Sequence, residues 1–164
     1  MRRAAVILAA ASLACVATAA AADPLAGPLA PLSFMVGDWK AVGDASGPGA
    51  GGVSSIHPDL GGRLLVRRDH VLLKDGGGFD VYQVVYADGT DLRSEFIDTE
   101  GHTIHYRVTT GPGPSAIFRS DPTGDAPGFR LTYMNAADRL HVRFEIAPPG
   151  GAFKVYSEGD VARQ

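Results

Sequence analysis

Histidines and carboxylates are the side chains of this sequence best suited to metal binding or acid–base chemistry, and the one closely spaced histidine pair is His102 and His105. Residues three apart on a strand point to opposite faces, so this pair cannot share a metal ion unless the strand bulges. Asp98 and Glu100 lie beside His102 in the sequence, and we interpret the three as solvated turn residues that bind a cation only adventitiously. A zinc site also needs a third ligand and supporting hydrogen bonds. We therefore predict no metal site.

Two other motifs match a functional pattern only in part. Residues 47–52 read Gly-Pro-Gly-Ala-Gly-Gly, which fits G-x-G-x-x-G, but residues 53–56 read as a strand. The dinucleotide motif requires a helix at that point, so we interpret this segment as a flexible loop. Residues 113–117 contain a serine but lack the second glycine of a nucleophile elbow. We predict no catalytic residue.

Polar side chains on otherwise apolar strand faces are more informative, because an inward polar group must find a partner. An apolar cavity with a few convergent polar groups is the usual form of a small-molecule site. Arg68 would suit a carboxylate or phosphate head group. The expected ligand-binding residues are Trp39, Val66, Arg68, His70, Gln83, Ser94, Phe96, Tyr106, Tyr133 and Phe144. These groups could instead satisfy one another in a filled core, or the assumed strand alternation could be displaced by one residue.

The element expected to anchor these residues is the segment 31–40, Pro-Leu-Ser-Phe-Met-Val-Gly-Asp-Trp-Lys, which holds the one tryptophan of the chain. A proline-led apolar turn that ends at Gly37 predicts a short helix or 3₁₀ turn. Trp39 is then the first large inward side chain of the opening strand. An indole in this position can close the end of a barrel.

Short segments of strand character follow, separated by turn residues such as Asp88-Gly89 and Glu100-Gly101. The predicted strands are residues 38–42, 53–57, 63–73, 79–87, 91–98, 102–109, 115–120, 129–135, 139–147 and 152–160. The glycine-rich residues 43–52 are expected to form a mobile loop at a barrel rim. Hairpin-length connections favour an all-β fold, a single up-and-down antiparallel β-barrel of about ten strands with a short N-terminal helical plug. Such a barrel is wide enough for one small ligand.

The N-terminal residues 1–22 have the pattern of a signal peptide: Arg2 and Arg3, then an apolar run, then three alanines at 20–22. We expect cleavage after Ala22, a periplasmic or secreted protein, a flexible leader over 23–30 and the barrel domain over 31–164. Cys15 raises lipid attachment as an alternative, but Ser12 stands where a leucine would be expected.

Composition narrows the partners. The formal net charge of the chain is −3, which argues against nucleic acid or an anionic membrane as a partner. No later apolar run is long enough to span a membrane. The sequence leaves the oligomeric state open.

Three segments resemble a known group of proteins: residues 34–39 (Phe-Met-Val-Gly-Asp-Trp), residues 59–66 (Asp-Leu-Gly-Gly-Arg-Leu-Leu-Val) and residues 144–150 (Phe-Glu-Ile-Ala-Pro-Pro-Gly). Gly37-Asp38-Trp39 resembles the G-x-W signature of lipocalin-like (calycin) barrels. The three segments together resemble small exported bacterial proteins of unknown function, related in shape to nitrobindin-type barrels. Those barrels bind haem through a late axial histidine, whereas alternation places His141 on the outer face, so we expect neither haem nor another cofactor.

These observations predict an exported binding protein that holds a small apolar or amphipathic ligand, such as a carboxylic acid or lipid-like molecule, in the barrel cavity. One alternative is a hydrolase or isomerase that acts on a lipid-like substrate in the same cavity, which would need His70 within reach of Asp69 or Glu95. Another is a protein-interaction barrel with a filled core and an exposed apolar patch.

Overall fold

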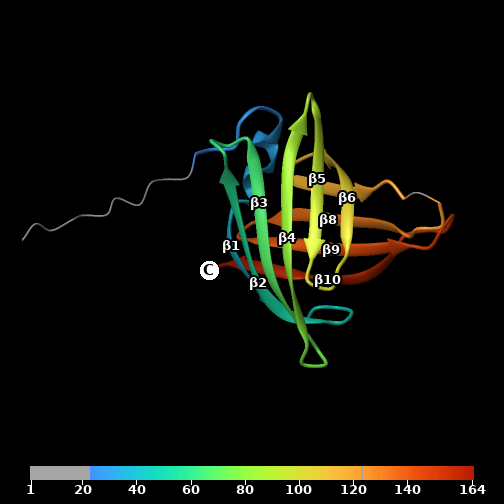
Figure 1. Cartoon of the computed structure of the whole chain (residues 1–164). Coiled ribbons are helices and arrows are strands. Elements are labelled where there is room, and N and C mark those ends of the chain that lie inside the picture. The colour runs from blue at the N-terminus through green and yellow to red at the C-terminus, as the bar shows by residue number, and fades with distance from the viewer. Residues whose placement is uncertain (1–22, 123) are drawn as a thin grey trace, which may run out of the picture.

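The computed structural model describes residues 23–122 and 124–164, which form a closed antiparallel barrel of ten strands (Figure 1). The strands are β1 (Gly37–Val42), β2 (Gly49–Asp59), β3 (Leu64–Leu73), β4 (Gly78–Asp88), β5 (Asp91–Asp98), β6 (Thr103–Thr110), β7 (Ser115–Ser120), β8 (Gly128–Ala136), β9 (Arg139–Ala147) and β10 (Lys154–Arg163). Each strand pairs with the next one in the chain, and β1 pairs with β10 to close the barrel. The predicted up-and-down topology is confirmed.

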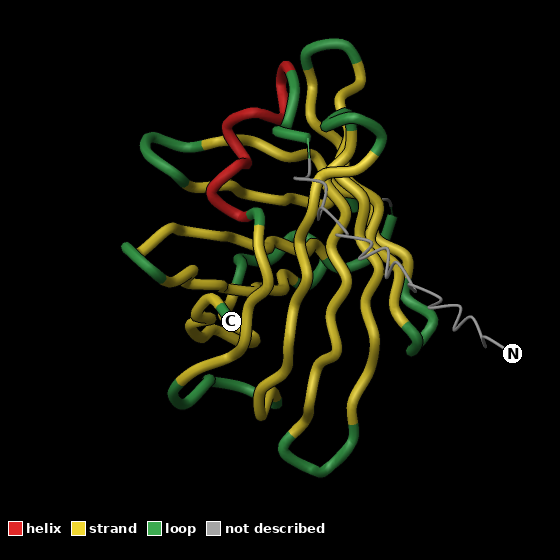
Figure 2. Tube along the Cα trace, turned by 90° about the vertical axis from the view of Figure 1, so that its left-hand side faces the viewer, coloured by secondary structure: helices red, strands yellow, loops and turns green. Residues whose placement is uncertain are grey.

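One end of the barrel is closed by the 3₁₀ helix η1 (Gly27–Met35), which lies at the top of the barrel in both views (Figures 1 and 2). Its buried side chains Leu29, Leu32 and Met35 join the core cluster that surrounds Trp39. The Trp39 indole donates a hydrogen bond from Nε1 to the carbonyl oxygen of Met35 at 2.8 Å. The predicted plug and the role of its tryptophan therefore agree with the structure.

Arg163, at the end of β10, packs over the ring of the same tryptophan. Its guanidinium lies 4.5 Å from the centre of the Trp39 ring, and Nη1 donates to the carbonyl oxygen of Val36 at 2.9 Å. Trp39 and Arg163 are also directly paired in the β1–β10 ladder. Arg163 therefore links the β1–β10 pair, which closes the barrel, to the end of the plug at Val36.

The largest differences from the sequence-based expectation lie at the start of the helix and the start of β2. The helix begins at Gly27, because Leu25 is buried and the Ala26 amide bonds to the Gly62 carbonyl oxygen at 2.9 Å, which ties down the start of the described chain. Strand β2 begins at Gly49, so residues 49–52 of the glycine-rich segment 43–52, expected to be a mobile loop, are part of the sheet. At Gly52 a Cβ atom would lie 2.3 Å from the carbonyl oxygen of His70, so glycine allows β2 and β3 to approach closely.

The proposed signal peptide, residues 1–22 with Cys15, lies outside the described residues. In the part of the chain that the structure describes, no helix has the length and apolar character needed to cross a membrane.

Candidate binding cavity

A cavity of about 460 Å³ occupies the barrel and reaches the end opposite η1. The strands end there in the turn after β3, the β5–β6 hairpin and the loop before β2. Its walls are mainly apolar, with aromatic rings from Phe79, Phe96, Tyr106, Phe129, Phe144 and Tyr156 and aliphatic side chains from Val71, Leu73, Val81, Ile104, Leu131, Val142 and Ile146. This size and lining are typical of sites that enclose a small organic molecule.

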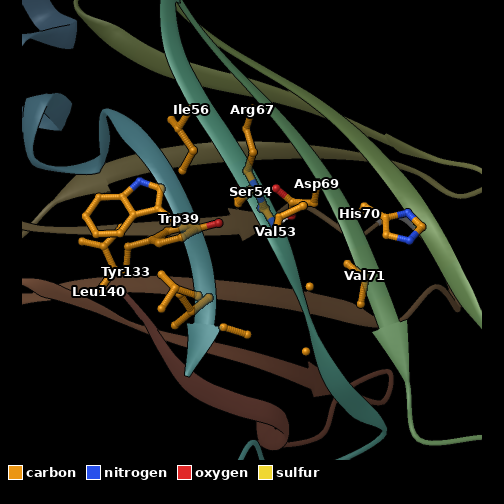
Figure 3. A pocket seen from close by; sticks show the side chains of 15 residues that line it. Trp39, Val53, Ser54, Ile56, Arg67, Asp69, His70, Val71, Tyr133 and Leu140 are labelled. Atoms are coloured by element: carbon orange, nitrogen blue, oxygen red, sulfur yellow. Dashed lines mark hydrogen bonds and ion pairs between the residues drawn. The ribbon is translucent and has the colours of Figure 1, made fainter. Parts of the chain in front are cut away.

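A smaller cavity of about 120 Å³ lies closer to Trp39 (Figure 3). Arg67, Val71 and Val142 border both cavities, so the two adjoin at Arg67. Nearer to η1 the barrel is filled, because Leu29, Leu32 and Met35 of the plug are buried there in the same core cluster as Trp39. The interior is therefore packed at the plug end and hollow toward the opposite mouth.

Arg67 and Asp69 form an ion pair inside the barrel, and their side chains are only 14% and 6% exposed. Arg67 Nε donates to Asp69 Oδ1 at 2.9 Å, Nη2 donates to Oδ2, and Nη1 donates to Gln83 Oε1 at 2.9 Å. Burial opposes the charge of the guanidinium, but the charge of the Asp69 carboxylate and its hydrogen bonds, together with Tyr133 and Tyr106, outweigh this effect and raise the pKa of Arg67. The pair is charged and electrically balanced.

Further hydrogen bonds hold this pair in place. Ser54 Oγ donates to Asp69 Oδ1 at 2.6 Å from β2, and Gln83 Nε2 donates to Ser94 Oγ at 2.8 Å from β4 to β5. Four neighbouring strands thus contribute to one polar network. Every fully enclosed side-chain nitrogen or oxygen among the described residues has a partner.

Tyr106 and Tyr133 lie beside the Arg67 side chain. Both are only 3% exposed, and the Arg67 guanidinium lies 5.6 Å from the centre of the Tyr133 ring. Burial raises the pKa of both tyrosines, and the nearby Arg67 charge only partly opposes it. Both hydroxyls are therefore protonated at neutral pH and can donate as well as accept hydrogen bonds.

The predicted inward face of β3 is wrong. Arg68 and His70 are exposed on the outer wall, where Arg68 stacks 5.1 Å from the Tyr82 ring centre and His70 Nδ1 lies 2.7 Å from Asp80 Oδ1. His70 borders the smaller cavity, but its imidazole points away from it (Figure 3). Val66 is buried, yet it alternates with Leu65 and is absent from the core cluster that fills the barrel. Charged residues and apolar residues occur on both faces of this strand, so alternation alone did not distinguish them.

The other seven predicted residues do face the interior. Trp39 and Tyr133 border the smaller cavity, and Phe96, Tyr106 and Phe144 border the larger one. Gln83 and Ser94 are fully buried and line neither cavity; Gln83 accepts from Arg67, and Ser94 accepts from Gln83.

Sequence reasoning missed Arg67, Asp69 and Ser54, although one signal points to them. Arg67 and Asp69 are two residues apart, so they share a strand face and can neutralise each other, whereas Arg68 and His70 cannot. Arg67 is also the ladder partner of Gln83, which the alternation of β4 correctly placed inside.

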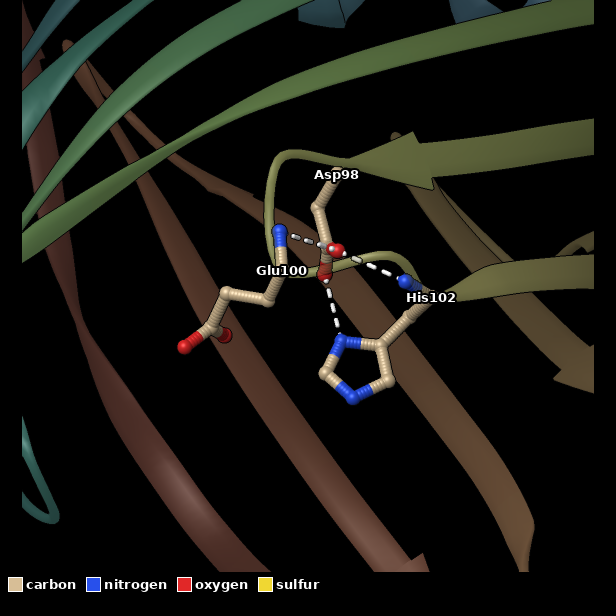
Figure 4. Close-up of side chains that lie close together, drawn as sticks. All are labelled: Asp98, Glu100 and His102. Atoms are coloured by element: carbon tan, nitrogen blue, oxygen red, sulfur yellow. Dashed lines mark hydrogen bonds and ion pairs between the residues drawn. The ribbon is translucent and has the colours of Figure 1, made fainter.

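Asp98, Glu100 and His102 gather at the mouth of the larger cavity (Figure 4). Asp98 Oδ1 accepts from the amides of Glu100 at 3.0 Å and His102 at 2.9 Å, and its Oδ2 lies 2.9 Å from His102 Nδ1. The Asp98 carboxylate is thus already used to stabilise the hairpin turn, as the interpretation of these residues as turn residues implies.

The remaining histidines also lie on the outer wall. His141 is directed away from the cavity and its Nδ1 lies 2.8 Å from Asp160 Oδ1. His70 contacts Asp80, so it does not form the dyad with Asp69 or Glu95 that the hydrolase alternative needs. Glu95 instead bonds His105.

Compared with models of known protein families and with curated proteins, the chain matches none.

Proposed function

We propose that the protein binds one small, partly apolar ligand in the barrel cavity and that the ligand enters at the mouth opposite η1. The observation that supports this most directly is the cavity of about 460 Å³, apolar along its walls and polar at Arg67. An interaction barrel would have a filled core, and a filled core would leave no cavity of this size. The lipocalin-like resemblance of Gly37-Asp38-Trp39 agrees with this function.

We also propose that the protein is exported and cleaved after Ala22, on the basis of the signal-peptide pattern of residues 1–22. Haem is not part of the proposal, because His141 is engaged by Asp160 on the outer wall.

Native mass spectrometry of the full chain, expressed in a bacterial host and purified without added ligand, tests both proposals. We expect a reproducible excess mass from a bound ligand, which denaturation releases. The polypeptide itself should have the mass of residues 23–164. An absorbance spectrum of the same sample would show a Soret band if haem were the ligand.

A bare protein mass, with no uptake from a lipid extract, would contradict ligand binding and favour the interaction barrel. A polypeptide that retains residues 1–22 in the periplasmic fraction would contradict cleavage.

A further inference from the structure

The inner end of the cavity is polar but electrically neutral, and from this we infer the chemistry of the ligand. Resting on the proposed function, we propose that the ligand carries an uncharged polar head group, a hydroxyl or a carbonyl, which lies against Arg67, Tyr106 and Tyr133 while its apolar part extends toward the mouth. This differs from the carboxylic acid that the sequence suggested through Arg68.

The charge balance at Arg67 argues against an acid. Three of the five N–H groups of the guanidinium already donate to Asp69 and Gln83, so two remain for a ligand. A carboxylate placed there would bring a second negative charge beside Asp69 with one cation to compensate both. Burying an uncompensated charge is costly, whereas a neutral acceptor can take the two N–H groups without that cost.

The two tyrosine hydroxyls supply the complementary groups. In residues 23–122 and 124–164 no hydrogen bond to either hydroxyl is present, and every enclosed side-chain oxygen does have a partner, so each hydroxyl borders open space. Figure 3 shows Tyr133 and the Arg67–Asp69 pair around the same space. These hydroxyls face the cavity without a protein partner, and a ligand hydroxyl or carbonyl can provide one.

The residues at the mouth of the cavity also favour an uncharged ligand over an anionic one. Asp98 and Glu100 border it, and His102 is the one basic side chain among the residues that line this end. An anionic ligand would meet these carboxylates on entry, and their like charges repel it. The walls between the mouth and Arg67 are apolar and favour an apolar body in the rest of the ligand.

Three probes with the same ten-carbon chain separate the possibilities: decan-1-ol, decanoate and decylamine, each used to displace the neutral dye N-phenyl-1-naphthylamine at pH 7. We expect decan-1-ol to bind about tenfold more tightly than either charged probe, because neither charge finds a free counter-ion at Arg67–Asp69. Equal or tighter binding of decanoate or decylamine would overturn the inference while leaving the proposed function intact. Failure of the dye and all three probes to bind would instead contradict the proposed function.

Tyrosine variants test the position of the head group. Tyr106→Phe and Tyr133→Phe should each weaken decan-1-ol binding by about three- to tenfold, since each removes one hydrogen bond of ordinary strength. Thermal stability of the empty protein should not change, because neither hydroxyl bonds to the protein. Tyr82→Phe is the matched control on the outer wall, where Tyr82 is 42% exposed, and should bind like the wild type. Wild-type affinity in both interior variants would overturn the inference.

The isosteric variant Asp69→Asn tests the charge argument itself. It leaves Arg67 without its carboxylate, so decanoate should become the tighter ligand and decan-1-ol should change little. An unchanged order of affinities in a folded Asp69→Asn protein would show that the Arg67–Asp69 balance does not select the ligand.

Discussion

Two charged side chains of this barrel, Arg67 and Arg130, are stabilised by carboxylate partners, one two residues away on the same strand and one directly opposite on the next strand. Arg67 and Asp69 share one face of β3 and bury their charges together. On the outer wall Arg130 is the ladder partner of Glu145, and it contacts the Glu145 carboxylate through Nε and Nη2 at 2.5 Å each. Phe153 covers the Arg130 guanidinium, 4.4 Å from the ring centre. Such bidentate, partly covered pairs stabilise more than exposed ones.

The Arg130–Glu145 pair predicts a pH-dependent stability. Hydrogen bonds from Arg130 lower the pKa of Glu145, so this pair stabilises the fold above the ordinary glutamate range and the stabilisation is lost as pH falls below it. Glu145→Gln should lower the free energy of unfolding by about 1 kcal/mol at pH 7, a value that allows for the water contact of Arg130. Urea denaturation of both proteins at pH 7 and near pH 3.5 measures the difference, which should be smaller at the lower pH.

The exposed pair Arg107–Asp121 provides the control, since both side chains are 60% exposed. Asp121→Asn should have the smaller effect at pH 7. A Glu145→Gln effect that is equal at both pH values would contradict the assigned role of Arg130.

Individual elements depend on glycine only at a few positions of close approach. At Gly62, before β3, φ is +78° and a Cβ atom would lie 2.0 Å from the carbonyl oxygen of Pro24. The carbonyl oxygen of Gly62 accepts a hydrogen bond from the Ala26 amide, so this turn fixes the chain that leads into η1. At Gly89, between β4 and β5, φ is +63° but nothing lies within 4 Å of the Cβ position. Both glycines have a left-handed backbone, but only at Gly62 would an added Cβ atom also clash with the neighbouring backbone.

This comparison predicts different costs for the same substitution. Gly89→Ala should destabilise the protein by about 1 kcal/mol, the cost of a left-handed conformation for a residue with a Cβ. Gly62→Ala should cost more than about 2 kcal/mol, because backbone must also move. Thermal unfolding of both variants measures this, and equal losses would show that the chain before η1 adapts freely.

At the scale of the whole molecule, the sheet formed by residues 23–122 and 124–164 has no free edge, because β10 pairs with β1. Closure removes unpaired backbone N–H and C=O groups that would otherwise pair with another chain. The closing ladder includes Trp39 opposite Arg163, and the C-terminal Gln164 adds bonds to β1 at Asp38 and Trp39. Stability and solubility of the barrel are therefore expected to depend on its last strand.

Removal of β10, by ending the chain before Lys154, should expose the edges of β1 and β9 and abolish the monomeric barrel. Size-exclusion chromatography should show aggregated or expanded protein, and the near-UV circular dichroism of Trp39 should be lost. Deletion of Gln164 alone is the control and should keep both properties. A compact monomer with native near-UV signal after removal of β10 would contradict this role for closure.

The sequence by itself determined the all-β fold, nearly all strand positions and the plug. Turn residues recur at short intervals, and one clear apolar face alternates on β4 and β9, so local chemistry and period are enough there. The same alternation correctly placed Gln83, Ser94, Tyr106 and Tyr133 inside.

Only the tertiary structure decided which face of β3 is buried and where the cavity lies. Residues 64–73 are apolar at both ends, and Arg67, Arg68, Asp69 and His70 stand in the middle. Whichever face of the strand points inward, a similar apolar area is therefore buried. The choice depends on partners from other strands, Gln83 on β4 and Ser54 on β2, which satisfy Arg67 and Asp69. The early start of β2 has the same origin, since Gly52 is needed for close approach to His70 across the ladder. Contacts between strands, which no single segment encodes, settled both points.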